Sequence, residues 1–394
     1  MHFYKNIYYL YAAIFFRKLI FAYAIERLFA LERGMTVQLV VYAEIIYAIT
    51  IILLGVPAGI FADKFGRKHL IILGLVFTVF EFGVLIFAHN FWFFALSALV
   101  AGLGGSFKNT TWNAMLYDSL LACGKQADFE KTLGRMRAVG FIAALVSGLL
   151  GGFLAQQFGF TFNYWLSTGS AFMALLFTLK LSEPPKHAQH HVEDKASIRE
   201  IISAAYTFFK SHPDVFRMLV HVALIASVVN YMDEFWQVYL NDIAFPLVLF
   251  GVVSAGLTLI QMPGALLASK LLNRFSHQTL IIAASIIVTV GILWAAFAQH
   301  ATGILGMAAV CFAIALIEPV AAGYLHHRAD PAARATIESV ENMIHFVFII
   351  ALGLVFGYLS TQYSIFTGFW VLGFVAAFGC LVYVVIKRSK NICY

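Results

Sequence analysis

Three basic residues lie inside long apolar stretches, where a charge is unusual. Arg17 and Lys18 fall near the middle of the first stretch, and Lys108 begins the polar run KNTTWN inside the fourth. If these stretches cross a membrane, each charge costs at least about 2.5–3.5 kcal/mol, so a functional role is expected by default. Cations at one depth are typical of a site for an anionic or zwitterionic group. The candidate substrate ligands are therefore Arg17, Lys108, Asn109 and Asn113.

Two alternatives for these cations stay open. Each side chain can pair with a nearby acid, or it can extend along its helix to the membrane interface. Because adjacent residues point about 100° apart on a helix, Arg17 and Lys18 are not expected to face one cavity equally.

Acids within the apolar stretches are candidates for carrying protons. A poorly solvated carboxylic acid can load and release a proton near neutral pH. Glu318 precedes Pro319, and a proline inside a helix interrupts backbone hydrogen bonds. Glu44 and Glu81 can instead be packing acids with partners elsewhere in the fold. The acids assigned to proton coupling are Glu26, Asp233, Glu234 and Glu318.

The segment GIFADKFGRKHLI (59–71), which we call the hinge, concentrates charge between the second and third apolar stretches. Gly59 and Gly66 allow two helices to meet in a tight turn. An acid at a helix end, here Asp63, can accept hydrogen bonds from the N-terminal amides of a neighbouring helix. A nearby arginine, here Arg67, can pair with a second acid. The alternative is that these charges only orient the chain in a membrane.

The composition indicates which elements carry these residues. Of the 394 residues, 61% are hydrophobic and 12% are charged, and the mean hydropathy is +0.85. A soluble domain has about 45–50% apolar and about 25% charged residues. Apolar runs of about 20 residues therefore predict an all-α integral membrane protein rather than a β-barrel. Four scattered cysteines predict neither a disulfide framework nor a metal site.

We predict twelve transmembrane helices, with a polar linker after the sixth. The linker opens with SEPPKHAQHHVEDKAS and continues as the amphipathic stretch IREIISAAYTFFK. The predicted organisation is an N-terminal six-helix bundle (1–182), a cytoplasmic linker (183–212) and a C-terminal six-helix bundle (213–394). The spans are expected near 7–31, 37–61, 70–88, 91–118, 133–157, 162–182, 213–240, 247–268, 279–298, 302–325, 336–360 and 364–387.

Basic residues predict the orientation of the chain. With the N-terminus in the cytoplasm, almost all Lys and Arg residues between the spans are cytoplasmic, including Lys64, Lys68 and Arg137, whereas Arg33 is external. Both termini are therefore expected in the cytoplasm. The net charge of +6 reflects this topology and implies no nucleic-acid partner.

The two halves resemble each other. GLLGGFLAQQFGFTFNYW (148–165) resembles GLVFGYLSTQYSIFTGFW (353–370) at an offset of 205, and PAGIFADK from Pro57 resembles PGALLASK from Pro263 at an offset of 206. This agreement predicts a duplicated six-helix unit with both copies in the same orientation, a parallel repeat found in transporters. The acid of the hinge is not repeated, because Ser269 stands where Asp63 stands in the first half.

The hinge resembles the cytoplasmic signature of the major facilitator superfamily, G-x-x-x-D-x-x-G-R-K, and the resemblance covers the whole chain. It implies two pseudo-symmetric six-helix bundles, a cavity lined by spans 1, 4, 7 and 10, and alternating access. It also implies a cytoplasmic latch, in which Asp63 docks near Arg334 and Arg67 pairs with Asp118. The residues of this latch are Gly59, Asp63, Gly66, Arg67, Lys68, Asp118 and Arg334.

An external gate is a further hypothesis. Spans 1 and 7 approach each other externally in this architecture when the cavity opens inward, and the offset of 206 places Arg27 opposite Asp233. We expect these two residues to form an ion pair that closes the external side. The alternative is that each is interfacial and solvated.

The expected function is export coupled to protons. The stretches at 116–135 and 334–339 resemble a bacterial branch of drug and metabolite exporters, although SGLLGG (147–152) has Leu149 where such exporters often carry proline. GLGGS (102–106) lacks the nucleotide-binding pattern, so an ion gradient is the expected energy source. The alternatives are an importer of an anionic or zwitterionic nutrient and a non-transporting sensor.

The resulting prediction is a monomeric, multi-pass protein of the bacterial inner membrane, and not an enzyme. Its partners are a small amphiphilic, anionic or zwitterionic substrate, protons and the lipid bilayer. No metal or other cofactor is expected.

Overall fold

The computed structural model describes residues 3–108, 111–184, 209–326 and 331–391. Within these ranges it describes every side chain except those of residues 55–65, 108, 326, 331–339 and 386–391. All the regular elements in the described residues are helices, and each of the twelve predicted spans overlaps at least one of them. The all-α prediction is therefore confirmed.

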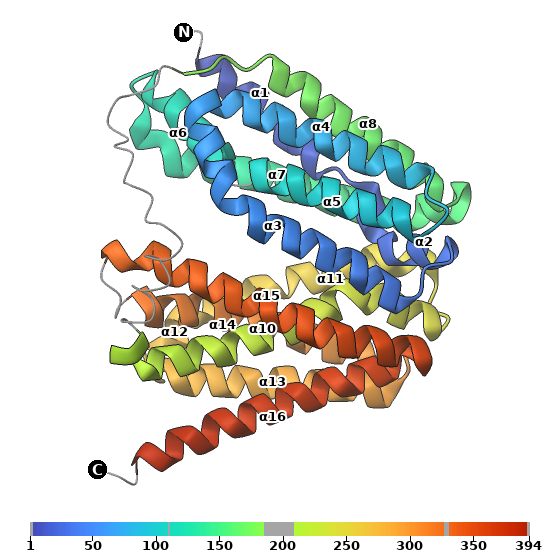
Figure 1. The fold of residues 1–394 in the computed structure, drawn as a ribbon, viewed down its shortest axis with the longest axis vertical. Helices are drawn as coiled ribbons and strands as arrows, with labels where there is room; N and C mark the ends of the chain where they lie inside the picture. Colours follow the sequence, from blue (N-terminus) through green and yellow to red (C-terminus); the bar gives the residue numbers. More distant parts are fainter. Residues whose placement is uncertain (1–2, 109–110, 185–208, 327–330, 392–394) are drawn as a thin grey trace. The chain divides into compact units, whose positions relative to one another are not determined.

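The described part of the first half contains eight α-helices and two short 3₁₀ helices, whose arrangement Figure 1 shows. They are α1 (Tyr4–Lys18), η1 (Phe21–Ala24), α2 (Glu26–Glu32), α3 (Val37–Phe65), α4 (Arg67–Ile86), α5 (Phe91–Lys108), α6 (Thr111–Leu121), η2 (Gln126–Asp128), α7 (Phe129–Phe158) and α8 (Phe160–Leu179).

In the described part of the second half, the first long helix begins at Pro213. Its elements are α10 (Pro213–Asp242), η3 (Leu247–Leu249), α11 (Phe250–Leu259), α12 (Gln261–Leu272), α13 (His277–Ala298), α14 (Gly303–His326), α15 (Pro331–Gln362) and α16 (Ile365–Asn391).

Eleven helical segments among the described residues are long and apolar enough to cross a membrane. The predicted sixth span, α8, is a helix of 20 residues but is more polar than these eleven, because it contains Asn163, Ser167 and Ser170. Large apolar side chains such as Trp92, Phe80 and Leu266 are exposed, as expected of surfaces that face lipid.

The chain divides into two compact units. One unit is Met1–His191 with Pro246–Ala255, and the other is Val192–Phe245 with Gly256–Tyr394. The segment around η3 belongs to the first unit because it packs against α7, where a Cβ on Gly152 would collide with the carbonyl oxygen of Leu247. The residue ranges predicted for the two bundles and the linker stay predictions.

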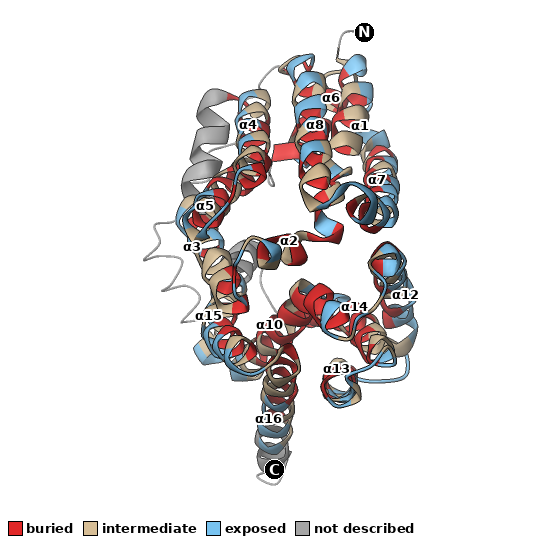
Figure 2. Cartoon of the chain, turned by 90° about the vertical axis from the view of Figure 1, so that its right-hand side faces the viewer, coloured by how far each residue is buried: buried red, intermediate tan, exposed pale blue. Residues whose placement is uncertain are grey.

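Each unit has its own apolar core. In the first, α4 packs against α5 and α8, and α1 packs against α7 and α8, around buried Leu10, Leu75 and Met115. In the second, α13 packs against α14 and α16, and α10 packs against α15 and α16. Figure 2 shows buried residues on the helix faces that meet neighbouring helices, with exposed residues on the opposite faces.

The first predicted span is not one continuous helix. We predicted 7–31, but α1 ends at Lys18, Ile20 is extended, and η1 and α2 follow. Span 8 is likewise split, into α11 and α12.

Two polar side chains of α8 explain why span 1 can break without a glycine or proline. Asn163 donates from Nδ2 to the carbonyl oxygen of Phe21 at 3.2 Å, and the amide of Ala22 donates to Oγ of Ser167 at 3.0 Å. These bonds satisfy backbone groups that the break removes from the helix, which is a condition for irregular backbone at membrane depth. Gly151 of α7 also allows close approach, because a Cβ there would lie 2.8 Å from the carbonyl oxygen of Phe21.

Candidate functional site

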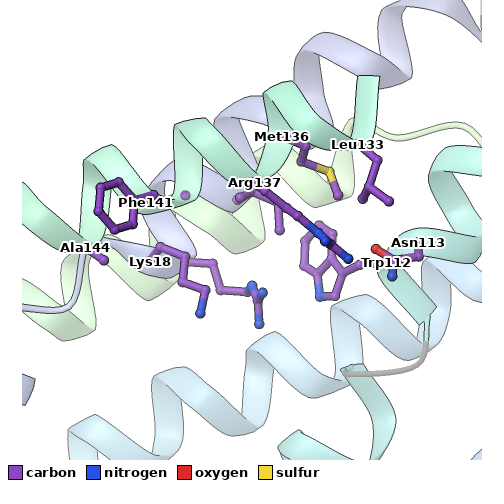
Figure 3. A pocket seen from close by; sticks show the side chains of 11 residues that line it. Lys18, Trp112, Asn113, Leu133, Met136, Arg137, Phe141 and Ala144 are labelled. Carbon is purple, nitrogen blue, oxygen red and sulfur yellow. The ribbon is translucent and has the colours of Figure 1, made fainter. Parts of the chain in front are cut away.

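A cavity of about 420 Å³ lies where α1 ends, between α1, α6 and α7 of the first unit (Figure 3). Arg17 and Lys18 form the last turn of α1, and cations are stabilised at the carboxyl end of a helix by its dipole. Gly140 lets α7 pass close to this turn, because a Cβ there would lie 3.2 Å from Cγ2 of Ile14 and 3.4 Å from Cγ of Lys18. The cavity is lined by Ile14, Arg17, Lys18, Trp112, Asn113, Leu133, Met136, Arg137, Gly140, Phe141 and Ala144.

Arg17 is held against an aromatic ring. Its guanidinium carbon lies 5.2 Å from the ring centroid of Trp112, whose side chain is buried. A cation over the face of an indole ring is stabilised by the ring quadrupole. The Nε atom of Arg17 is buried and has no hydrogen-bond partner in the described structure.

Arg17 and Lys18 were not expected to face the cavity equally, and they differ in exposure, since Lys18 is exposed and Arg17 only partly so. Both line it, because α1 ends there and its last turn lies beside α7. Arg137 is a third cation, for which the sequence predicted a place in a cytoplasmic turn. It lies within α7, and Figure 3 shows its side chain extending over Trp112 toward Asn113. No sequence signal distinguished Arg137, because its role depends on the meeting of α1 and α7.

Among the described residues, no acid compensates the charge of the cavity. None of its lining residues is acidic, and within the part of the chain that the structure describes no ion pair involves Arg17, Lys18 or Arg137. Lys18 and Arg137 are exposed, and Arg17 is partly exposed. Phe141, Met136 and further apolar side chains complete the lining, so the cavity suits an anionic group on an apolar body.

The remaining predicted substrate ligands differ in what the structure describes. Asn113 lines the cavity and is exposed. The Lys108 side chain and Asn109 lie outside the described residues, so their contact with substrate stays a prediction.

Part of the expected cytoplasmic network is present in the first unit. Arg67 forms an ion pair with Asp118, as the resemblance implied, and its Nη1 also donates to the carbonyl oxygen of Ala114. The side chains of Asp63 and Arg334, and the surroundings of Gly59, lie outside the described residues. Their role in a latch stays a prediction.

An acid that the sequence did not single out caps α4. The two carboxylate oxygens of Glu183 accept hydrogen bonds from the amides of Arg67 at 2.7 Å and Lys68 at 2.8 Å. Gly66 makes this possible, because its φ is +91° and a Cβ there would lie 3.0 Å from Oε1 of Glu183. The available signal was the acid in SEPP, directly after span 6.

Asn6 fixes the backbone next to Glu183. Its Nδ2 donates to the carbonyl oxygen of Ser182 at 2.8 Å, and its Oδ1 accepts from the Ser182 amide at 2.9 Å. The same Nδ2 donates to Oγ of Ser119 at 3.0 Å. The chain that leaves α8 is therefore attached to α1, α4 and α6.

A second charged cluster lies beyond the break in span 1. Arg27 of α2 lies 2.6 Å from Oε1 of Glu44 and 3.4 Å from Oε1 of Glu26. Glu44 thus has a partner elsewhere in the fold, as expected of a packing acid. That partner is Arg27, which the sequence predicted to pair with Asp233.

The remaining predicted proton carriers belong to the second unit. Asp233 and Glu234 lie on α10, and Glu318 is exposed on α14 beside Pro319, which is inside that helix. Because Arg27 and Asp233 belong to different units, the external gate stays a prediction.

In a comparison with known families, residues 8–337 match the model of the Major Facilitator Superfamily. Multidrug resistance protein 2 of Bacillus subtilis is 26% identical over 372 residues, which cover 89% of this chain and 86% of that protein. The transporter YuxJ of the same species is 22% identical, with 84% of each chain covered. A folate-like transporter of Dictyostelium discoideum is 26% identical over 61% of this chain, and the match spans only 41% of its length.

Solved structures share the fold at low sequence identity. A point mutant of the nucleoside transporter NupG superposes with a TM-score of 0.82 at 14% identity, covering 96% of this chain and 99% of that chain. A D-xylose-proton symporter superposes with a TM-score of 0.70 at 13% identity, covering 97% of this chain and 96% of that chain.

Proposed function

The chain belongs to the Major Facilitator Superfamily, and on that premise we propose that it is a secondary transporter of a small amphiphilic anion or zwitterion. The observation that carries this proposal is the cavity in which Arg17, Lys18 and Arg137 meet without an acidic lining residue. A bound anion supplies the compensating charge that no acidic residue of the lining supplies.

The size and lining of the cavity support an apolar body on that anion. A volume of about 420 Å³ lies in the range of small-molecule sites, which are mostly apolar with a few placed polar groups. Trp112 and Phe141 offer aromatic surface beside the cations. The relative named as a folate-like transporter fits this class, because folate carries carboxylates on an aromatic body.

Alternating access is the proposed mechanism. The Arg67–Asp118 pair and the capping of α4 by Glu183 support a cytoplasmic network that reorganises during transport. In this proposal the latch also includes Gly59, Asp63 and Arg334. The distribution of basic residues supports cytoplasmic termini in the inner membrane of a bacterial cell, and the working unit of the proposal is a monomer.

Export and uptake are the two candidate directions. The relatives named as multidrug resistance proteins support export, which for a proton-coupled carrier is antiport. An inside-negative membrane potential drives an anion outward at about 2.3 kcal/mol per charge per 100 mV. Coupling to protons is therefore needed for uptake of an anion, whereas its export needs none.

Transport by the full-length protein in proteoliposomes tests the proposal. We expect an imposed pH gradient to drive flux of radiolabelled folate, used as an aromatic anionic probe, and the sign of the flux gives the direction. Binding of the probe without flux would favour the sensor alternative.

Thermal stabilisation by benzenedisulfonate tests the cavity itself. We expect its apparent affinity to fall about tenfold or more, equivalent to 1.4 kcal/mol or more, in Arg17→Gln and Arg137→Gln. Arg135→Gln is the matched control, because Arg135 is exposed on the same helix and is not among the residues lining the cavity. Equal stabilisation of all these proteins would overturn the cavity assignment.

A further inference from the structure

A row of tyrosines lies along one face of α1, close to the residue at which that helix begins. Tyr4, Tyr8 and Tyr11 are spaced i, i+4 and i+7, so they share one face of the helix. Tyr4 is 39% exposed and Tyr8 is 59% exposed, and their rings meet edge to face with 5.8 Å between centroids. Exposed tyrosines near a helix end are typical of the level at which lipid headgroups lie.

Cations border this row at both of its ends. Lys125, which directly precedes η2, places Nζ 4.6 Å from the centroid of the Tyr4 ring. At the other end, Oη of Tyr11 donates to the carbonyl oxygen of Thr132 in α7 at 3.4 Å. Arg135 lies less than one turn beyond Thr132 on the same helix, and it is within electrostatic range of Tyr11. The row therefore lies between a lysine and an arginine.

α7 continues this surface with a stripe that changes from basic to apolar. The stripe consists of Lys131, Arg135, Ala138, Ile142 and Val146, all of them exposed, and their spacing places them on one face of the helix. At about 1.5 Å per residue, the distance from Arg135 to Val146 is about 16 Å. This length is about half of a hydrocarbon core of about 30 Å. The apolar part of the stripe therefore matches the acyl chain of one leaflet.

The cations of this surface have no acidic partner among the described residues. No ion pair there involves Lys125, Lys131 or Arg135. Asp128 and Glu130 lie between these cations in the sequence, but both are exposed and neither forms an ion pair in the described structure. Glu130 directly precedes Lys131, so the two side chains point about 100° apart on α7. An external phosphate group is a suitable counterion for this surface.

This surface is distinct from the anion cavity. Arg137 lines the cavity and Arg135 does not, and residues two positions apart on a helix point about 200° apart. Figure 3 shows the Arg137 side chain extending over Trp112, inside the cavity. α7 thus carries one arginine on each of two opposite faces. We name the second surface the tyrosine–cation face, which consists of Tyr4, Tyr8, Tyr11, Lys125, Lys131 and Arg135.

We propose that the tyrosine–cation face binds the headgroup of an anionic phospholipid, with one acyl chain lying along Ala138, Ile142 and Val146. Arginine and lysine form charge-assisted hydrogen bonds to phosphate oxygens, and a tyrosine hydroxyl is a further donor. The distribution of basic residues predicts that α1 begins on the cytoplasmic side, where anionic lipids attract basic segments. The lipid site is independent of the proposed transport substrate.

The contact between Lys125 and Tyr4 distinguishes a defined site from general attraction to a charged membrane. A lysine held by an aromatic ring has less rotational freedom to lose when a phosphate binds, and preorganisation of this kind raises affinity. Lys180 provides a comparison at the same end of the unit. It is exposed, and its Nζ lies 5.7 Å from the ring centroid of Phe177, but it lies at the end of α8 and outside the tyrosine–cation face.

Thermal unfolding of the full-length protein in mixed micelles tests the site. We expect dioleoyl phosphatidylglycerol to stabilise the parent protein more than phosphatidylcholine with the same acyl chains. Lys125→Gln and Arg135→Gln should each lower the apparent affinity for phosphatidylglycerol about fivefold, which corresponds to about 1 kcal/mol per basic residue. Lys180→Gln and Arg274→Gln are the matched controls, because each removes one exposed cation elsewhere, and both should bind the lipid as the parent protein does.

Conservative variants and a second measurement separate lipid binding from effects on folding. Arg135→Lys should keep most of the affinity because it keeps the charge. Tyr4→Leu removes the ring that holds Lys125 and should weaken binding several-fold, whereas Tyr4→Phe should not. Native mass spectrometry of the same proteins measures how much phosphatidylglycerol each retains, and this measurement does not depend on the unfolding temperature.

Three results would overturn the lipid site. One is equal stabilisation by phosphatidylglycerol and phosphatidylcholine, and another is the same loss of affinity in the Lys180 and Arg274 variants as in the Lys125 and Arg135 variants. The third is competition by glycerol phosphate at the same concentration as the lipid, which would identify a soluble anion as the occupant.

Arg17→Gln separates the lipid site from the anion cavity. The response to phosphatidylglycerol should persist in this variant, and its loss there would place the headgroup in the cavity and overturn the lipid site. Failure of benzenedisulfonate to bind the parent protein would instead overturn the cavity and leave the lipid response as the test of the tyrosine–cation face.

Discussion

The guanidinium group of Arg17 lies over the indole ring of Trp112, with 5.2 Å between the guanidinium carbon and the ring centroid. The contact joins the end of α1 to the first turn of α6, two elements that border the cavity. It holds a cation in place without neutralising it, so the charge remains available to a ligand. A carboxylate paired with Arg17 would also have fixed the side chain, but it would have neutralised the positive charge.

Replacement of Trp112 tests this contact. Trp112→Leu removes the ring that orients Arg17, whereas Trp112→Phe keeps an aromatic face. A cation–π contact contributes about 0.5–2 kcal/mol, so the leucine variant should bind benzenedisulfonate several-fold more weakly, and the phenylalanine variant should lie between it and the parent. Isothermal calorimetry measures both affinities. Equal affinity in the leucine variant and the parent would show that the ring does not position Arg17.

Asn163 is expected to support the break in span 1. Its Nδ2 donates to the carbonyl oxygens of Phe21 and Gly151 at 3.2 and 2.8 Å. Asn163→Leu leaves these buried acceptors without that donor, which should cost about 1–3 kcal/mol and lower the temperature of thermal unfolding. Thr168→Val is the control on the same helix, because Thr168 bonds only within α8, to Tyr164. If both variants unfold at the same temperature, the break is supported elsewhere.

Glu183 is expected to stabilise the end of the first unit at which α4 begins. Its carboxylate caps the amides of Arg67 and Lys68, and loss of a helix cap costs about 0.5–2 kcal/mol. Glu183→Ala should therefore lower the unfolding temperature in detergent. Glu130→Ala, an exposed acid in the first turn of α7, should change it much less. A larger loss in the Glu130 variant would contradict the role of the cap.

Two double charge swaps distinguish the partners of Arg27. The structure pairs Arg27 with Glu44, and the sequence predicted Asp233. Arg27→Glu with Glu44→Arg should recover the thermal stability that either single variant loses, because the two side chains contact each other within one unit. Arg27→Asp with Asp233→Arg should recover transport if the external gate forms. Transport in the second double variant that stays as low as in its single variants would remove the gate from the mechanism.

The membrane class and the helices were predictable from short-range patterns. Apolar runs alone located every predicted span, because a helix that crosses lipid must satisfy its own backbone within one segment. The pairing of Arg67 with Asp118 was implied by the resemblance to the family, and the structure shows this ion pair. Arg17 and Asn113 were recognised as candidate ligands because polar groups in apolar stretches are costly to keep.

Several features depended on contacts between segments far apart in the chain. The break after Lys18 carries no glycine or proline, and it is stabilised by Asn163 and Ser167 of α8. Arg137 was assigned to a cytoplasmic turn from the distribution of basic residues along the chain, whereas its place in the cavity follows from the packing of α7 beside α1. The carboxylate of Glu183 accepts hydrogen bonds from the amides of Arg67 and Lys68, which are 116 and 115 residues away in the sequence.

The sequence by itself determined that the chain is a helical membrane protein of duplicated design, because hydropathy and repeat offsets are properties of the linear chain. Only the tertiary structure decided which charges act together. In the structure, Arg17, Lys18 and Arg137 line one cavity, and Arg27 forms an ion pair with Glu44. The physical reason is that electrostatic energy depends on distance in space and on local solvation, and neither quantity is set by the spacing of residues along the chain.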